Sequence, residues 1–499
     1  MPRRPITTMG FALLLGVCIG AGSVLAPAPA RLGSTTTGDA ALGARVREAT
    51  GDGLGYRGIQ VTFVDKEKLT FAGLGDSGNP AHPSVDESTV FEAGSIGKPM
   101  TGMLLADLED HKLLDLRAPL EHLLPERSFS DPLIGQATLT DLATHRAGLE
   151  KMPDDLDMVG RNLRLMLLGE DPYHGLGEDD VLNAAESASA GTPGRYLYSN
   201  LGMALAGHTA ARHAGHPFAE LLSARLFGPL GMRDSRVMAA GDPLPPRAAE
   251  GRQATGPPVD HWYASGYTPA GDIWTTGRDL GVFLRAVIRK TAPGARAAIP
   301  THEAERNGRT GLGWFTSKIG GRDITWQNGA TGGFTSYMAF DGAAERGVIV
   351  LGNTDRPVDA IGERLLGLEP TVPPATGPTH AFVTAAVALG APLPLLVGWL
   401  RPGAAAGRRR STGLICVHAA FGAAALALDW RRGNWLSVPP ELWAVGSGVL
   451  LCAFLLAVAG RGPRPPEEQP TSCPDPTGGL ARTAALWTGC LAVLLAAQL

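Results

Sequence analysis

Ser95 and Lys98 stand three residues apart in the stretch AGSIGKPM (93–100), which is poor in other charge. On the first turn of a helix, residues at this spacing share a face, so the amine can approach the hydroxyl. A serine hydroxyl is a weak nucleophile until a base takes its proton, and a desolvated lysine can be that base. The spacing therefore predicts a nucleophilic Ser95 activated by Lys98, although S-x-x-K also occurs on solvated surfaces.

A second candidate is Tyr198-Ser199-Asn200, which comes just before a Gly/Ala-rich helical stretch. A tyrosine beside an ammonium group titrates low and can carry a proton to a leaving group. The Asn200 amide can hold Lys98 and a substrate carbonyl. The alternative is a core tyrosine next to a helix-capping Ser-Asn pair.

A third candidate is the glycine-rich stretch TWQNGATGGFTSYMAFD (325–341). Glycines in a strand let a ligand backbone approach closely. The N–H of Ala330 can then pair with that of Ser95 as an oxyanion hole. Taken alone, the stretch is equally well a glycine-rich strand end.

Composition excludes several classes of protein. The net charge of −4 argues against a nucleic-acid binder. The five cysteines all lie outside residues 19–415, so the middle of the chain has neither a disulfide framework nor a thiolate metal site. The twelve histidines include no HExxH pair. We therefore expect no metal and no cofactor.

The region over 36–368 is predicted to be one α+β domain. Short, β-branched runs predict strands, and apolar residues at helical spacing predict helices. The expected strands are 57–65, 68–76, 336–341 and 347–353, and the expected helices are 98–116, 218–232 and 278–290. Strands at both ends indicate one sheet closed by the two ends of the domain, with a helical lobe inserted between them.

Both ends of the chain point to a membrane. Residues 1–30 are typical of a signal peptide or an N-terminal anchor. A Pro-rich linker (369–379) precedes a membrane domain over 380–499, with apolar runs at 381–400, 412–428, 442–459 and 483–499. The Ala-rich second run is the weakest, so we expect three or four helices. The 18% charged content, below the roughly 25% of soluble domains, agrees with partial burial in lipid.

Charge in the connecting loops sets the expected orientation. Arginines gather after the first and third runs and are fewer after the second: Arg401, Arg408, Arg409, Arg410, Arg461, Arg464 and Arg482, against Arg431 and Arg432. The positive-inside rule then places the catalytic domain outside the cytoplasm, at the cell membrane. The Ala and Gly content of the helices permits close packing, including a homodimer through the membrane helices.

These motifs together resemble the serine β-lactamase and penicillin-binding protein superfamily, in the branch of class C β-lactamases, D-aminopeptidases and esterases. The resemblance covers about residues 40–365 and includes the flanking phrases DLATHRAGL (141–149), LFGPLGM (226–232) and GDIWTTGRDLGVFL (271–284). It implies an antiparallel sheet flanked by helices. It also implies that Ser95 is acylated, that Lys98 is its base, that Tyr198 relays a proton and that Asn200 positions substrate.

One position departs from the pattern of the superfamily. Relatives usually carry Lys or His at the start of the third motif, whereas this chain has Gln327-Asn328-Gly329. The cation that attracts a penicillin carboxylate is missing, which counts against β-lactamase and D,D-carboxypeptidase activity. The two amides suit a neutral or amide-bearing substrate better.

The exported domain followed by membrane helices is similar to the membrane-bound prodrug peptidases of nonribosomal peptide pathways, of the colibactin-peptidase type. That similarity implies a small-molecule or acylated-peptide substrate and removal of an N-acyl-D-amino-acid leader. Candidates for leader recognition are Glu92, His261 and Asn328, and Gln327 is a further candidate for substrate binding. Two of these have a structural alternative: Glu92 is equally suited to pair with Lys98, and His261 fits a surface histidine. His145 fits packing at a helix end. Two other functions stay open: a serine esterase or β-lactamase-like hydrolase, and a ligand sensor without turnover.

Overall fold

The computed structural model describes residues 8–153, 155–263, 265–305, 308–370, 378–400 and 412–459. The chain forms two compact units, which are described separately. One comprises Ala30–Ala254 and Pro258–Ala375, and the other comprises Met1–Pro29, Thr255–Pro257 and Thr376–Leu499.

A nine-stranded antiparallel sheet forms the centre of the larger unit, in the order β1-β3-β2-β12-β11-β10-β9-β8-β7. Its early strands pair with its last strand: Val61 of β2 lies opposite Val350 of β12. The strands are β1 (Thr36–Gly38), β2 (Gly58–Asp65), β3 (Lys68–Gly75), β7 (His302–Glu303), β8 (Arg309–Thr310), β9 (Phe315–Ile319), β10 (Arg322–Ala330), β11 (Thr335–Asp341) and β12 (Arg346–Gly352). The expected closure of one sheet by both ends of the domain is confirmed.

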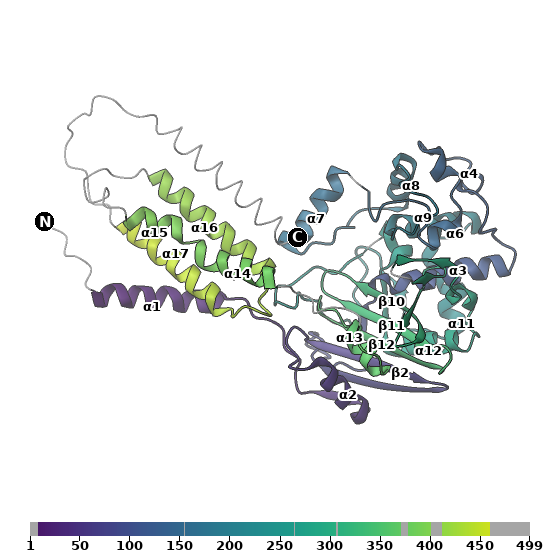
Figure 1. Ribbon diagram of the computed structural model, residues 1–499, viewed down its shortest axis with the longest axis horizontal. Coiled ribbons are helices and arrows are strands. Elements are labelled where there is room, and N and C mark those ends of the chain that lie inside the picture. The colour runs from purple at the N-terminus through teal and green to yellow at the C-terminus, as the bar shows by residue number, and fades with distance from the viewer. Residues whose placement is uncertain are drawn as a thin grey trace. The chain divides into compact units, whose positions relative to one another are not determined.

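Helices cover both faces of this sheet (Figure 1). Because side chains alternate along a strand, β11 sends Met338 into one core and Tyr337 into the other. The first face packs on α3 (Gly97–Asp110) and α12 (Gly277–Ile288). The second face packs on α2 (Ala40–Thr50) and α13 (Asp359–Leu365).

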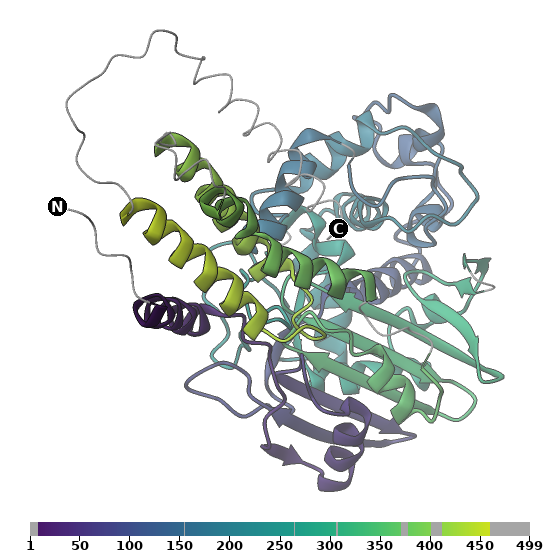
Figure 2. The same cartoon turned by 60° about the vertical axis from the view of Figure 1, so that its left-hand side comes forward.

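The middle of the chain forms a helical lobe, seen at the upper right in Figure 2. Its elements are α4 (Leu120–Leu123), α5 (Pro132–Gly135), α6 (Leu139–Ala143), α7 (Leu156–Leu168), α8 (Glu178–Ser187) and α9 (Asn200–Ala214). The chain then continues through α10 (Phe218–Leu222), the π-helical turn η2 (Ser223–Phe227) and α11 (Gly228–Leu230), which lies beside α12 (Figure 1). Two 3₁₀ turns, η3 (Ser265–Ala270) and η4 (Ala295–Ala298), and a small sheet of β4 (Val90–Glu92), β6 (Ile273–Thr276) and β5 (Arg236–Val237) connect the lobe to the main sheet.

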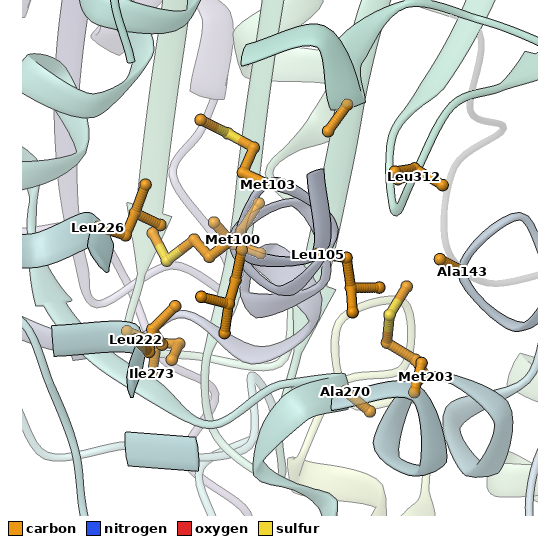
Figure 3. Packing of buried hydrophobic residues seen from close by; sticks show 14 of the residues in the cluster. Met100, Met103, Leu105, Ala143, Met203, Leu222, Leu226, Ala270, Ile273 and Leu312 are labelled. Carbon is orange, nitrogen blue, oxygen red and sulfur yellow. The ribbon is translucent and has the colours of Figure 1, made fainter. Parts of the chain in front are cut away.

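Helix α3 lies at the centre of this unit, and every residue from Gly97 to Leu108 is buried. Figure 3 shows Met100, Met103 and Leu105 of this helix surrounded by side chains from other elements, among them Met203 of α9 and Leu226 of η2. A helix whose residues are buried on every face must be enclosed by other elements on all sides. The N-terminal turn of α3 is therefore fixed in place by the whole domain.

Most elements expected in this unit are confirmed, with shifts at their ends. The helix expected over 98–116 ends at Asp110, because Lys112 adopts a left-handed backbone with φ of 59°. The stretch 218–232 forms three short consecutive helical pieces rather than one helix.

The smaller unit contains α1 (Thr8–Leu25), α14 (Pro378–Gly390), α15 (Leu393–Leu400), α16 (Thr412–Arg432) and α17 (Glu441–Ala459). Within the described residues, three helical segments are long and apolar enough to cross a membrane: Thr8–Leu25, Pro378–Leu396 and Glu441–Ala459. A Cβ at Gly448 of α17 would lie 2.6 Å from Ile19 Cα of α1, so the two helices touch closely. The run expected over 483–499 and most of the linker lie outside the described residues.

Close packing around α3 yields a stability test with two matched glycines. A Cβ on Gly102 of α3 would lie 2.0 Å from the backbone oxygen of Leu312, whereas one on Gly160 of α7 meets nothing within 4 Å. We expect Gly102→Ala to lower the free energy of unfolding by about 1–3 kcal/mol. Gly160→Ala should instead raise it by up to about 1 kcal/mol. Thermal unfolding of the full-length protein in detergent measures both, and equal midpoints for the two variants would contradict the packing described here.

Candidate active site

Ser95 lies in the turn η1 (Gly94–Ile96), between the end of β4 and the start of α3. Its side chain is partly exposed, in contrast to its buried neighbours. Gly94 adopts a φ of 51°, and a Cβ there would lie 2.7 Å from the backbone nitrogen of Ala330. Only glycine permits both this conformation and this close approach. The turn thus presents the hydroxyl at the N-terminus of a rigid helix.

Lys98 is completely buried one turn further along α3. Its Nζ donates to Ser95 Oγ at 2.8 Å and to the carbonyl oxygen of Ala270 at 2.5 Å. Burial lowers the pKa of Lys98, the nearby Tyr198 partly opposes this, and the charge of Lys151 lowers it further. Burial therefore favours the neutral form of the amine, which is the form that the interpretation of Lys98 as a base requires.

Tyr198 approaches Ser95 from the helical lobe, and its hydroxyl donates to Ser95 Oγ at 3.1 Å. Burial by itself raises the pKa of Tyr198, but the adjacent Lys98 outweighs it, so the pKa lies below its ordinary value. Lys98 Nζ lies 5.0 Å from the centre of the Tyr198 ring. Two such closely coupled groups titrate as a pair, and protons can pass between them through Ser95.

His145 packs beneath this pair, as expected for a histidine at a helix end. Its ring centre lies 4.6 Å from that of Tyr198, and its Nδ1 accepts a hydrogen bond from the Ser199 N–H at 3.2 Å. Burial, reinforced by the charge of Lys98, lowers the pKa of His145 to about 3. The ring is therefore neutral at physiological pH and supports Tyr198 without adding charge.

The strand β10 brings the Ala330 backbone to the nucleophile. A Cβ at Gly329 would lie 2.8 Å from the backbone nitrogen of Ser95, so strand and turn are in direct contact. Ser336 Oγ on the neighbouring strand donates to the carbonyl oxygen of Ala93 at 2.7 Å and fixes this approach. The backbone of Ala330 therefore lies beside that of Ser95, as the predicted oxyanion hole of these two N–H groups requires.

A small cavity of about 50 Å³ adjoins Ser95. Among the residues that line it, Asn200 has a buried Oδ1 without a hydrogen-bond partner in the described part of the chain. Its Nδ2 lies 3.4 Å from the Tyr173 hydroxyl rather than near Lys98. Asn200 is therefore placed to accept an N–H from a substrate, whereas the expected contact with Lys98 is replaced by the Ala270 carbonyl.

Two of the other predicted substrate contacts lie away from this cavity. Gln327 is 1% exposed, and its Nε2 donates to the backbone oxygen of Ser95 at 3.3 Å. Asn328 points to the opposite face of the sheet, where its Nδ2 donates to Asp359 Oδ1 at 2.7 Å. Adjacent residues of a strand necessarily face opposite ways. Gln327 thus positions the nucleophile turn from behind, and Asn328 does not reach the Ser95 cavity.

Glu92 and His261 form a pair with each other. Glu92 Oε1 lies 2.7 Å from His261 Nδ1, so Glu92 pairs with His261 rather than with Lys98. Burial raises the pKa of Glu92, which the hydrogen bond to His261 only partly offsets, while the Glu92 contact outweighs burial and raises the pKa of His261. With a side chain only 14% exposed, His261 is not a surface histidine. The pair holds the loop that places Trp262 in the cavity wall.

Sequence reasoning missed several residues of this site. The aromatic wall consists of Tyr173, Trp262 and Tyr267, with ring centres of Tyr173 and Trp262 5.3 Å apart and of Tyr173 and Tyr267 5.0 Å apart. Asp272 also lines the cavity. The density of aromatic residues in HWYASGY (261–267) was a usable signal, but no motif marks these positions.

This arrangement supports acyl transfer in two stages. In the first stage, neutral Lys98 can take the proton of Ser95 as Oγ attacks a carbonyl carbon, and the oxyanion can form against the N–H groups of Ser95 and Ala330. The bond to the leaving group breaks as Tyr198 donates a proton to it, and Lys98 returns a proton to Tyr198. A water molecule then attacks the acyl-Ser95 ester with the same groups acting in reverse.

Comparison with known proteins agrees with this chemistry. The family profile Beta-lactamase matches residues 44–369, so the chain belongs to this family of serine hydrolases. It is 25% identical over 320 residues to the D-alanyl-D-alanine-carboxypeptidase/endopeptidase AmpH of Escherichia coli K12, covering 58% of this chain and 77% of that protein. It is 27% identical over 317 residues to a D-aminopeptidase of Gluconobacter oxydans, covering 60% and 56%.

The fold agrees as well. The crystal structure of a class C β-lactamase from Rhodobacter sphaeroides matches with a TM-score of 0.54 and 22% identity, covering 64% of this chain and 95% of that one. The expected α+β fold with a large antiparallel sheet is thereby confirmed.

The roles assigned to the three central residues predict separable kinetic effects. Lys98→Ala and Tyr198→Phe should each lower kcat by about 10²- to 10⁴-fold and leave KM nearly unchanged, because proton transfer acts mainly in the transition state. Turnover of an activated ester by the full-length protein in detergent measures this, with Ser95→Ala as the fully inactive reference. Changes confined to KM would make Lys98 and Tyr198 binding residues instead.

Proposed function

We propose that the chain is a membrane-tethered, extracytoplasmic serine amidohydrolase that cleaves the amide bond following an N-acylated D-amino acid. Within that class, the substrate that fits best has a small side chain ending in an amide, such as D-asparagine. Removal of an N-acyl-D-asparaginyl leader from an exported peptide precursor, as in prodrug peptidases of the colibactin-peptidase type, is an activity of this kind.

The chemistry of the cavity beside Ser95 carries this proposal. Asn200 Oδ1 and the Asp272 carboxylate contribute hydrogen-bond acceptors, and none of the described lining residues is a lysine or arginine. An amide NH₂ finds acceptors there, whereas a carboxylate would lose its hydration without a compensating charge. The volume of about 50 Å³ restricts the side chain to a small one.

An exposed apolar surface supports an acylated leader. Helix α7 turns Leu156, Val159 and Leu163 outward, with exposed fractions of 90%, 59% and 42%. Their spacing puts them on one face of the helix. The inner face of α7 adjoins the active-site loop, since a Cβ at Gly332 would lie 3.6 Å from Leu165 Cδ1. Helix α7 thus presents apolar side chains both at this loop and on its exposed face.

The apolar helices support the tether and the location. They fit a bilayer by length and composition, and the orientation rests on the arginine-rich loops. The close contact of α1 with α17 favours an anchor over a cleaved signal peptide. A homodimer through these helices is part of the same proposal and rests on their Ala and Gly content.

A β-lactamase or D,D-carboxypeptidase-like hydrolase is the second candidate, and the names of the relatives favour it more directly than leader removal. The observation in its favour is the position of Lys151, whose charge lowers the pKa of both Lys98 and Tyr198. Lys151 therefore brings a second positive charge to the site, although position 327 carries a neutral glutamine. A sensor without turnover is disfavoured by the assembled contacts of Ser95, Lys98 and Tyr198.

Substrate selectivity separates the two candidates. We expect cleavage of N-octanoyl-D-asparaginyl anilide, little cleavage of its L-isomer and negligible hydrolysis of nitrocefin. Values of kcat/KM measured side by side in detergent give the answer.

The opposite pattern would favour the second candidate. Rapid nitrocefin or D-Ala-D-Ala peptide hydrolysis that is lost in Lys151→Ala, with no cleavage of any N-acyl-D-amino-acid amide, would overturn the leader-peptidase proposal. Lys66→Ala is the matched control, because Lys66 lies in the turn between β2 and β3 at the sheet end.

A further inference from the structure

A second and larger hollow begins at the catalytic tyrosine. It has a volume of about 520 Å³ and runs along β9, β10 and β11 on the sheet face that carries α13. We call it the aromatic groove and define it by Tyr196, Tyr198, Phe315, Trp326, Tyr337, Asp359 and Glu363. It shares no lining residue with the small cavity beside Ser95.

Aromatic rings follow one another along the groove. Ring centres are separated by 6.4 Å from Tyr198 to Phe315, 5.2 Å from Phe315 to Trp326 and 6.4 Å from Trp326 to Tyr337. Phe315 and Trp326 lie directly opposite each other in the β9–β10 pairing. Cross-strand neighbours on one face place their rings side by side. A flat group can therefore stack along this wall.

The far end of the groove is acidic. Asp359 and Glu363 lie one turn apart on α13 and are 6% and 2% exposed. Asp359 accepts a hydrogen bond from Asn328 and forms no ion pair within the described part of the chain. Tyr337, 2% exposed, also lines the groove, and its hydroxyl has no partner among the described residues. Burial raises the pKa of Asp359, as expected for a carboxylate without a cation beside it.

The rim of the groove does not cancel this charge. Glu305, Arg309 and Lys318 line it from exposed positions, where their charges are screened by solvent. The buried carboxylate of Asp359 is screened much less, so it has the larger influence on which charge the groove accepts.

The position of Tyr198 indicates which part of a substrate enters. Its hydroxyl contacts Ser95, and in the proposed hydrolase mechanism this hydroxyl gives its proton to the leaving group. The acyl side of the substrate must contact the oxyanion hole and the small cavity, so the leaving side extends past Tyr198 into the groove. In acylation, Ser95 Oγ replaces the amine on the carbonyl carbon, the C–N bond breaks, and the amine departs with the Ser95 proton.

We propose that the aromatic groove is the leaving-group subsite and that it selects a leaving portion that is flat and carries a positive charge at its far end. The assignment to the leaving side rests on the proposed hydrolase function, whereas the preference for an aromatic cation rests on the groove itself.

Equilibrium binding tests the chemistry of the groove without turnover. Benzamidine, benzamide and benzoate have nearly the same shape and differ in charge. We expect the full-length protein in detergent to bind benzamidine at least about tenfold more tightly than benzamide, and benzoate more weakly still. Asp359→Asn should remove the advantage of benzamidine, and Trp326→Leu should weaken all three. Asp323→Asn, on the same strand but facing away from the groove, is the matched control and should change nothing.

Reaction of Ser95 tests the assignment to the leaving side without a D-asparaginyl substrate. Phosphonate esters that leave the same group on Ser95 can release 4-amidinophenol or 4-carbamoylphenol. The rate ratio of amidino to carbamoyl ester should be at least about tenfold higher in the wild type than in Asp359→Asn.

Three results would overturn the proposal: equal binding of benzoate and benzamidine, a preference for benzamidine that survives in Asp359→Asn, or equal rate ratios in the two proteins. If the D-asparaginyl substrate is not cleaved, only the proposed function is contradicted, because neither the binding experiment nor the phosphonate experiment uses that substrate. A normal melting temperature of Asp359→Asn, with Glu363→Gln as a second variant, excludes loss of fold as the cause.

Discussion

Burial of a single amine is the constraint on which the rest of this structure depends. Lysine is almost never fully buried without a partner, because removing its charge from water is costly. Lys98 is nevertheless enclosed in the most buried helix of the domain, with one hydroxyl and one carbonyl oxygen as its hydrogen-bond partners. The burial favours the neutral form of Lys98, and the neutral form is what Ser95 needs. The packing that buries α3 is therefore also what makes Lys98 able to activate Ser95.

The two faces of the sheet carry different parts of the site: the nucleophile on one face and the aromatic groove on the other. The face that carries α3 presents the nucleophile, and the end of β10 brings the backbone of Ala330 beside it. The opposite face carries Trp326, Asn328 and, on α13, Asp359. Tyr198 contacts Ser95 and also lines the groove on that opposite face. A residue in this position can couple recognition of the leaving group to its protonation.

The sequence predicted the parts of the site that depend on local spacing. Ser95 and Lys98 are one helical turn apart, so a helix start was enough to bring them together. The fold followed from strand and helix patterns at both ends of the domain, supported by the resemblance of its motifs. Alternation along β10 was not resolved in the prediction, and this is why Gln327 and Asn328 were both expected at the substrate although they face opposite ways.

Other contacts depend on tertiary structure and had no local signal. Glu92 and His261 are 169 residues apart and meet only when β4 packs beneath the loop of His261. Lys151 and the aromatic residues Tyr173 and Tyr267 come from loops and turns whose paths the sequence pattern does not define. Asn200 was expected to hold Lys98, but the Ala270 carbonyl occupies that position. The position of a backbone carbonyl in an irregular segment cannot be predicted from the pattern of residue types.

The pH dependence of Ser95 phosphonylation by a fluorophosphonate tests the central claim most directly. If neutral Lys98 activates Ser95, the rate rises through one ionisation well below the value of about 10.4 for a free lysine. Tyr198 raises the pKa of Lys98, so in Tyr198→Phe the labelling rate should still increase with pH, but the increase should occur at lower pH. Ser95→Ala should give no labelling at any pH. A rise that occurs only near the pKa of free lysine, or that disappears in Tyr198→Phe, would contradict the account.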